Sequence, residues 1–157
     1  MKKKICLIIL LTINFIINAQ KKESDYFTFY KGGGKYLKPL KYVLFIPKEG
    51  NVKTEEGRKK IFKIGSERFV FDKDKHKVDT SSVRFLNNIK LEKTTKLRDN
   101  EVVFYKNEIK KTEIYKKSGF SYPFPITKVH PYFKIYLLEK TDMKLIKYEV
   151  DWEYSDF

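Results

Sequence analysis

The sequence predicts an α+β domain: a mostly antiparallel sheet of about five or six strands with two helices packed on one face. Runs rich in aromatic and β-branched residues, typical of strands, lie towards both ends of the chain. Two segments with helical spacing and N-terminal capping residues lie between them, from residue 79 to residue 117. Strands and helices that are grouped in this way are typical of an α+β fold rather than of alternating βαβ units.

The N-terminus has the pattern of a secretory signal peptide. Lys2–Lys4 are followed by an apolar run, Ile5–Ile17, and by small or polar residues around Ala19. We expect cleavage after Ala19, which leaves residues 20–157 as a single α+β domain in the periplasm or outside the cell. The apolar run is shorter than the roughly 20 residues of a membrane span, so an uncleaved anchor is the alternative and no other span is expected. Cys6 is the only cysteine and lies in the signal, so the mature chain has no disulfide.

Four strands are predicted in the first half of the mature chain. The first covers the aromatic run at residues 26–30, and a glycine break follows it. The second covers residues 42–46 and ends at a proline. The third and fourth, at residues 61–64 and 69–71, form a hairpin, because the Gly-Ser pair between them suits a two-residue turn with positive φ. The polar stretch between the second and third strands is expected to be a loop.

Two helices are predicted next. Residues 79–82 offer N-cap oxygens to a short helix that begins at Val83, and Thr94 or Thr95 caps a longer helix that runs to about Lys117. On a helical projection the apolar residues of the longer helix occupy one broad arc. They are Leu97, Val102, Phe104, Tyr105, Ile109 and Tyr115.

Two acidic residues, Glu101 and Glu108, fall within that apolar arc. They are either a buried functional pair or residues near the surface that form ion pairs with Arg98 and Lys111. We expect the surface arrangement, because each of these basic residues stands three positions from its acid, at the spacing that brings side chains together on a helix.

The last part of the chain predicts a proline-containing connector and then two strands joined near Thr141. In the final strand Tyr148, Val150, Trp152 and Tyr154 alternate with Glu149, Asp151 and Glu153. We call these three acids the acidic stripe. Successive residues on one face of a strand are roughly 6.5 to 7 Å apart, and the catalytic carboxylates of glycoside hydrolases stand roughly 5 to 9.5 Å apart. The stripe therefore permits a carboxylate-dependent hydrolase that uses Glu149 and Asp151.

The net charge of +14, or +11 once the three signal lysines are removed, favours anionic partners. The charge is uneven, since Lys31–Lys63 holds ten basic and three acidic residues and Asp142–Phe157 holds five acidic residues and two lysines. The alternative is that the excess of lysine reflects a biased residue composition and solubility alone. Nucleic acid is not an expected partner of an exported protein.

No catalytic signature is present in the sequence. The mature chain has no cysteine nucleophile and no Gly-x-Ser-x-Gly motif, and His76 and His130 lack motif partners. We therefore expect no metal and no cofactor, and an enzyme is less expected than a binding protein.

The predicted function is that of a non-catalytic interaction module, such as an inhibitor or immunity-type protein, whose partner is another protein. Its predicted partner-binding residues are Glu149, Asp151, Glu153, Tyr122 and Phe124, the last two held outward by a loop stiffened by prolines. The alternatives are a hydrolase of envelope glycans and a binder of anionic lipid or polysaccharide.

Overall fold

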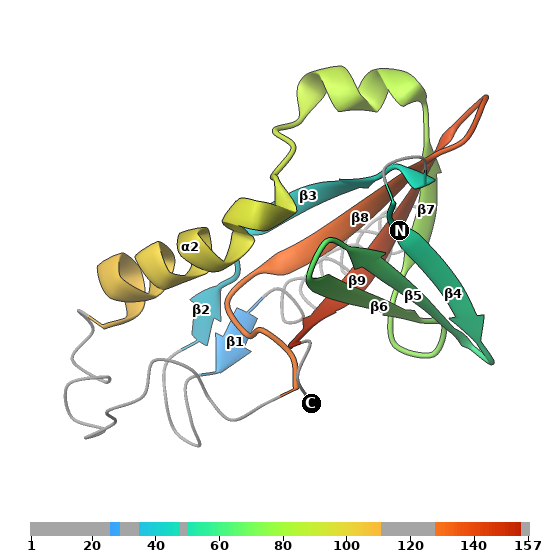
Figure 1. Cartoon of the computed structure of the whole chain (residues 1–157). Helices are drawn as coiled ribbons and strands as arrows, with labels where there is room; N and C mark the ends of the chain where they lie inside the picture. The colour runs from blue at the N-terminus through green and yellow to red at the C-terminus, as the bar shows by residue number, and fades with distance from the viewer. Residues whose placement is uncertain (1–25, 29–34, 48–49, 111–127, 155–157) are drawn as a thin grey trace, which may run out of the picture. The chain divides into compact units, whose positions relative to one another are not determined.

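The computed structural model describes residues 26–28, 35–47, 50–110 and 128–154 (Figure 1). The predicted signal peptide, Tyr122 and Phe124 lie outside these residues. The contacts within the chain divide it into two units, Met1–Lys38 and Pro39–Phe157, and each is described by itself. Among the described residues, no helix has both the length and the apolar character that a membrane crossing requires.

The first unit contains a two-stranded antiparallel sheet. Strand β1 (Tyr26–Thr28) pairs with β2 (Lys35–Leu37), and Tyr26 lies opposite Leu37. Strand β1 confirms the start of the strand predicted at residues 26–30. Strand β2 was not predicted, because three residues after a run of glycines carry too short a pattern to indicate a strand.

The second unit is an α+β fold built on a seven-stranded sheet, which confirms the predicted fold class. The strands follow the spatial order β3-β8-β9-β6-β5-β4, and β7 also pairs with β9. They are β3 (Leu40–Phe45), β4 (Val52–Glu56), β5 (Lys59–Ile64), β6 (Glu67–Asp72), β7 (Val78–Ser81), β8 (Lys134–Lys140) and β9 (Leu145–Glu153).

Strand β9 runs through the middle of this sheet (Figure 1). Along one edge it pairs with β8, where Ile135 lies opposite Val150. Along the other edge its first half pairs with β7 and its end pairs with β6, where Trp152 lies opposite Phe69. Strands β8 and β9 confirm the two strands predicted at the end of the chain.

The sheet is mixed, which corrects the expectation of a mostly antiparallel sheet of five or six strands. Strands β3 and β8 are parallel, with Leu40 opposite Lys134 and Phe45 opposite Glu139. Parallel neighbours need a long crossover, which local patterns do not reveal, and here the chain from β4 to α2 supplies it. Strands β4 and β7 raise the number of strands and were missed because most of their residues are exposed and show no apolar alternation.

The predicted hairpin is confirmed. Strands β5 and β6 pair antiparallel, with Phe62 opposite Phe69 and Ile64 opposite Glu67. Gly65 has φ of 60°, the left-handed conformation that a two-residue hairpin turn requires and that glycine adopts without a steric cost.

Two helical segments follow β7. The 3₁₀ helix η2 (Val83–Asn88) starts where the sequence predicted, and the Ser82 Oγ accepts a hydrogen bond from the Arg84 N–H at 3.2 Å. The helix α2 (Thr94–Phe104) continues as the π-helical turn η3 (Tyr105–Ile109), so the predicted longer helix is confirmed as far as Ile109. Residues 111–117 lie outside the described part, and the packing of both helices on one face of the sheet stays a prediction.

The predicted cap of α2 is wrong. Thr94 is the first helical residue, and the N-cap is Lys93, which makes no capping hydrogen bond through its side chain. The preceding residues are held extended, because Leu91 forms a β-bridge with Tyr42 and the Glu92 N–H donates to the Tyr42 carbonyl at 2.8 Å. This pairing fixes where the helix begins, whatever side chain stands at its start.

The core of the second unit is aromatic. Phe62 is fully buried, and its ring centroid lies 5.2 Å from that of Phe45 and 5.2 Å from that of Tyr148. These three rings come from β5, β3 and β9, so they join strands that lie far apart in the order of the sheet. The chain has a single cysteine and so can form no internal disulfide, and the burial of these rings contributes to its stability instead.

We expect Phe62→Ala to lower the free energy of unfolding by about 3 to 5 kcal/mol, because it removes a fully buried ring and leaves a cavity. Urea denaturation monitored by circular dichroism measures the change. Val52→Ala on the neighbouring strand β4 is the control, since Val52 is exposed and its truncation should cost less than about 0.5 kcal/mol. Equal losses in the two variants would contradict the assignment of Phe62 to the core.

Candidate functional site

All three acids of the acidic stripe lie beside a basic or imidazole group of the same chain. Glu149 lies 3.4 Å from the Lys134 ammonium, and Asp151 lies 3.4 Å from His76 Nε2. Glu153 is buried, and its Oε2 accepts a hydrogen bond from Arg68 Nε at 2.8 Å and lies 3.3 Å from the Lys128 ammonium.

These surroundings do not favour hydrolase chemistry. A general acid needs a carboxyl group that keeps its proton, which an apolar environment provides. The carboxylates of the stripe instead lie beside charged or imidazole groups: Glu149 beside Lys134, Asp151 beside His76, and Glu153 beside an arginine and a lysine. The other face of β9 matches its prediction, because Tyr148, Val150 and Trp152 are buried in the core.

A buried pair of titratable side chains lies at the end of β9. Glu101 of α2 and His130, in the segment before β8, are joined by a contact of 2.6 Å between Glu101 Oε2 and His130 Nδ1. Each side chain is 2% exposed. A carboxylate can only accept a hydrogen bond, so the Nδ1–H donates when Glu101 is ionised.

This pair corrects the expectation that Glu101 lies at the surface with Arg98. Arg98 Nε instead donates to Glu67 Oε1 at 2.9 Å. Glu67 is buried at the start of β6, and this bond connects α2 to the sheet. Glu108 is exposed, as predicted for it, and so the two acids do not form a buried pair.

Two aromatic rings enclose His130. The imidazole stacks on Trp152 with a centroid distance of 3.6 Å and an interplanar angle of 9°, and on Tyr154 at 3.7 Å and 29°. The His130 backbone N–H donates to the Trp152 carbonyl at 2.8 Å. The two rings therefore pack against both faces of the imidazole and hold it in place.

Trp152 also connects the buried carboxylates of Glu67 and Glu101 through its contacts with Glu67 and His130. Its indole N–H donates to Glu67 Oε2 at 2.7 Å while its ring stacks on His130. Glu67 thus binds Arg98 through one oxygen and Trp152 through the other, and Glu101 binds His130. We call these five residues, Glu67, Arg98, Glu101, His130 and Trp152, the buried polar cluster.

The chemistry open to the buried polar cluster is limited by its burial. A Glu–His pair can hold an imidazole in place for proton transfer, and within the described residues Glu101 Oε1 and His130 Nε2 have no hydrogen-bond partner. A catalytic base must reach its substrate, however, and these side chains are closed to solvent. The arrangement is that of a structural connection between α2 and the sheet.

An ordered loop between β6 and β7 presents three lysines. His76 is its anchor: its Nδ1 accepts from the Asp72 N–H at 2.9 Å, and its own N–H donates to the Asp72 carbonyl at 2.8 Å. Lys73, Lys75 and Lys77 are exposed and alternate in the sequence with Asp72, Asp74 and His76. We call residues 72–77 the basic loop.

The basic loop is connected to its neighbours on both sides. Its Lys73 N–H donates to the Arg58 carbonyl at 3.2 Å, and the Arg58 side chain pairs with Asp74 at 2.5 Å. At its other end the Lys77 carbonyl accepts from the Glu149 N–H at 2.9 Å. The loop is therefore held in one conformation by the β4–β5 turn and by β9.

Among the described residues, most of the charged side chains that belong to no ion pair are basic. The acidic side chains outside any ion pair are Glu56, Asp99, Glu108 and Asp142. The basic ones are Lys63, Lys73, Lys75, Lys77, Arg84, Lys93, Lys96, Lys106, Lys110, Lys140 and Lys144. In the described part of the chain most acids therefore belong to internal ion pairs, whereas many basic side chains do not.

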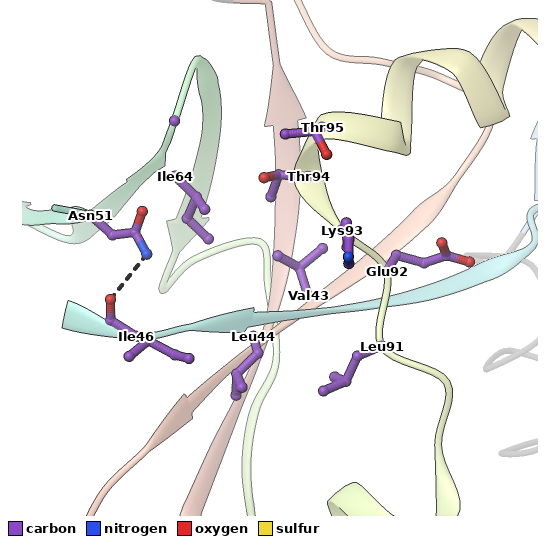
Figure 2. A pocket seen from close by; sticks show the side chains of 11 residues that line it. Val43, Leu44, Ile46, Asn51, Ile64, Leu91, Glu92, Lys93, Thr94 and Thr95 are labelled. Atoms are coloured by element: carbon purple, nitrogen blue, oxygen red, sulfur yellow. Dashed lines mark hydrogen bonds between the residues drawn. The ribbon is translucent and has the colours of Figure 1, made fainter. Parts of the chain in front are cut away.

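A cavity of about 610 Å³ lies where β3, the β5–β6 turn and the start of α2 meet. Figure 2 shows Asn51 and Ile64 on one side of it and the segment from Leu91 to Thr95 on the other. The residues that line it are Val43, Leu44, Ile46, Asn51, Ile64, Gly65, Leu91, Glu92, Lys93, Thr94 and Thr95.

The basic loop, the cavity and the buried polar cluster were not predicted as sites. In the sequence the basic loop is the run "DKDKHK", which has the character of a solvated turn. In the part of the chain that the structure describes, no three His, Cys, Asp or Glu side chains are placed to hold a metal ion. The cavity and the cluster join residues far apart in the sequence, so no local pattern indicates them.

Removing one member of the buried Glu101–His130 pair should be costly. Glu101→Leu and His130→Leu should each lower the free energy of unfolding by about 3 to 5 kcal/mol, because each leaves a buried polar group without its partner. The double variant should lose about 1 to 3 kcal/mol less than the sum. Urea denaturation of the four proteins measures this coupling. The exposed pair Arg58–Asp74 is the control, with an expected coupling below about 1 kcal/mol, and equal couplings would contradict the assignment.

The stability should fall at alkaline pH. Burial, and secondly the charge of Glu101, raise the pKa of Tyr154 from 10.0 to about 12. The folded protein therefore holds the Tyr154 proton more tightly than the unfolded chain does. The contribution of Tyr154 to the free energy of unfolding is complete below pH 10 and is lost as the pH rises from about 10 to about 12. Thermal unfolding across this range should show the fall, and Tyr154→Phe should reduce it. A fall of the same size in both proteins would show that Tyr154 does not contribute.

Comparison with known proteins identifies no family for this chain. No protein-family model matches the chain, and no curated protein and no solved structure is similar to it.

Proposed function

We propose that the protein is a small exported, non-catalytic binding protein whose partner is an acidic surface of another protein. Export is inferred from the signal-peptide pattern of residues 1–19. The observation that carries the binding proposal is the basic loop, in which Lys73, Lys75 and Lys77 are exposed and outside any ion pair while the backbone between them is fixed.

A fixed loop favours specific binding. A flexible lysine-rich segment loses conformational entropy when it binds, whereas a loop that is already ordered loses less. In the basic loop the order comes from His76, which is mostly buried between the Asp72 backbone and Asp151. The three ammonium groups then steer the approach of an acidic partner and fix its orientation.

In this proposal two acids of the stripe support the basic loop. Asp151 contacts His76, and the Glu149 N–H holds the Lys77 carbonyl. A direct role of Glu149, Asp151 and Glu153, or of Tyr122 and Phe124, in contacting the partner stays a prediction. The hydrolase alternative has less support, because Glu149 and Asp151 have a lysine and a histidine as neighbours.

The partner is tested by crosslinking and capture from the envelope of the source cells at moderate salt. We expect the wild-type protein to capture one specific protein, and the triple variant Lys73→Gln/Lys75→Gln/Lys77→Gln to retain less than about a tenth of it, since three charge-assisted contacts are lost. The matched control is Lys96→Gln/Lys106→Gln/Lys110→Gln, which removes the same charge from α2 and the turns after it and should retain most of the capture.

Three outcomes would contradict the proposal. Equal losses in the two triple variants would show a response to net charge alone. Capture of polysaccharide or anionic lipid in place of a protein would favour the second alternative. Recovery of monomer alone from the crosslinked envelope would exclude a stable protein partner.

A further inference from the structure

The cavity beside the start of α2 has the composition of a small-ligand site. Its volume of about 610 Å³ falls in the range of about 300 to 1,000 Å³ that is typical of ligand pockets. It is lined by apolar side chains from β3, the β5–β6 turn and Leu91, and by polar groups from residues 92–95 and Asn51. We propose that it binds a small carboxylate that carries an apolar chain, such as a medium-chain fatty acid. This site is separate from the basic loop and does not depend on a partner protein.

The apolar wall provides the contacts for the chain of such a ligand. Val43 and Ile64 are almost fully buried in the protein and present their remaining surface to the cavity, and Leu91 is 38% exposed at its edge. Gly65, in the turn beside Ile64, has no side chain, and a Cβ placed there would meet no atom within 4 Å. The wall is therefore apolar and open, which suits an alkyl chain.

The charge of the cavity favours an anion. Lys93 lines it and forms no ion pair with any residue that the structure describes, so its ammonium can meet a ligand. Glu92 also lines it, but its carboxylate is paired with the ammonium groups of Lys41 at 3.0 Å and Lys90 at 3.9 Å. It also accepts a hydrogen bond from the Asn100 amide at 3.3 Å. The free charge at the cavity is thus that of Lys93.

Hydrogen-bond donors lie on the same side as Lys93. Thr94 and Thr95 line the cavity at the first two positions of α2, where backbone N–H groups have no partner within the helix. No side chain caps this end, because the N-cap position is occupied by Lys93 itself. Asn51 is held by its own bond to the Ile46 carbonyl at 3.0 Å, which fixes its amide at the opposite side of the cavity. A carboxylate beside Lys93 would lie near the backbone N–H groups of Thr94 and Thr95.

The test uses octanoate as the probe, with octylamine as a ligand of the same chain and opposite charge. Isothermal titration calorimetry should show saturable 1:1 binding of octanoate and at least about tenfold weaker binding of octylamine. Amide chemical shifts should change at Gly65, Thr94 and Thr95. Absence of octanoate binding, or equal binding of the two probes, would overturn the proposal.

Two variants separate the site from the general positive charge of the protein. Lys93→Gln should weaken octanoate binding by about three- to tenfold, whereas Lys96→Gln, which removes the same charge from a residue outside the cavity, should change it less than about twofold. Equal effects would overturn the proposal. Thr95→Trp, which fills the rim from an exposed position, should abolish binding without changing the unfolding temperature by more than a few degrees.

The C-terminus of a partner protein also carries a carboxylate. A third probe therefore distinguishes a free small carboxylate from such a chain end. The tripeptide acetyl-Gly-Gly-Leu carries a terminal carboxylate next to an apolar side chain. We expect octanoate to bind at least as tightly as this peptide. A peptide that bound markedly tighter would overturn the free-ligand proposal in favour of the chain end of a partner.

Discussion

The structure of the second unit depends on the pairing of β9 along both of its edges. Its nine residues pair with β8 on one side and with β7 and β6 in succession on the other. Without β9, the pair β3–β8 and the group β4–β5–β6 would be two small sheets with open edges. The alternation of side chains on β9 then follows from its position: Tyr148, Val150 and Trp152 complete the core, and the acids of the stripe lie among basic groups of adjacent elements.

The end of β9 also fixes the helix. Trp152 contacts both Glu67 and His130, and these bind Arg98 and Glu101 of α2. These contacts favour one arrangement of α2 against the sheet, because another arrangement would leave more of these buried polar groups without partners. The buried polar cluster therefore orients α2 and so places Lys93 at the edge of the cavity. The position of the proposed ligand site depends in this way on contacts at a distant point of the helix.

Local patterns predicted the parts of the fold that are built from neighbours in sequence. The Gly65-Ser66 hairpin, the strands β8 and β9 and the Ser82 cap each depend on a few adjacent residues, and the structure confirms them. The polar strands β4 and β7 could not be predicted, because exposed edges need no apolar alternation. The parallel β3–β8 pair and the contact of Glu101 with His130 bring together residues far apart in the chain, and a single sequence carries no signal for them. In the same way, the composition predicted a basic surface, and only the ion pairs showed which lysines are free.

Strand β4 has a consequence for how the protein behaves at high concentration. In the described part of the chain it ends the sheet, so its outer backbone groups face away from β5 and offer a template for another chain. Val52 is exposed there, which would favour such contacts. Lys53, Glu55 and Glu56 follow it, however, and a second strand laid against this edge would have to bury their charges. The charges on β4 therefore disfavour the pairing of another strand at this edge, and they belong to side chains that contribute little to the core.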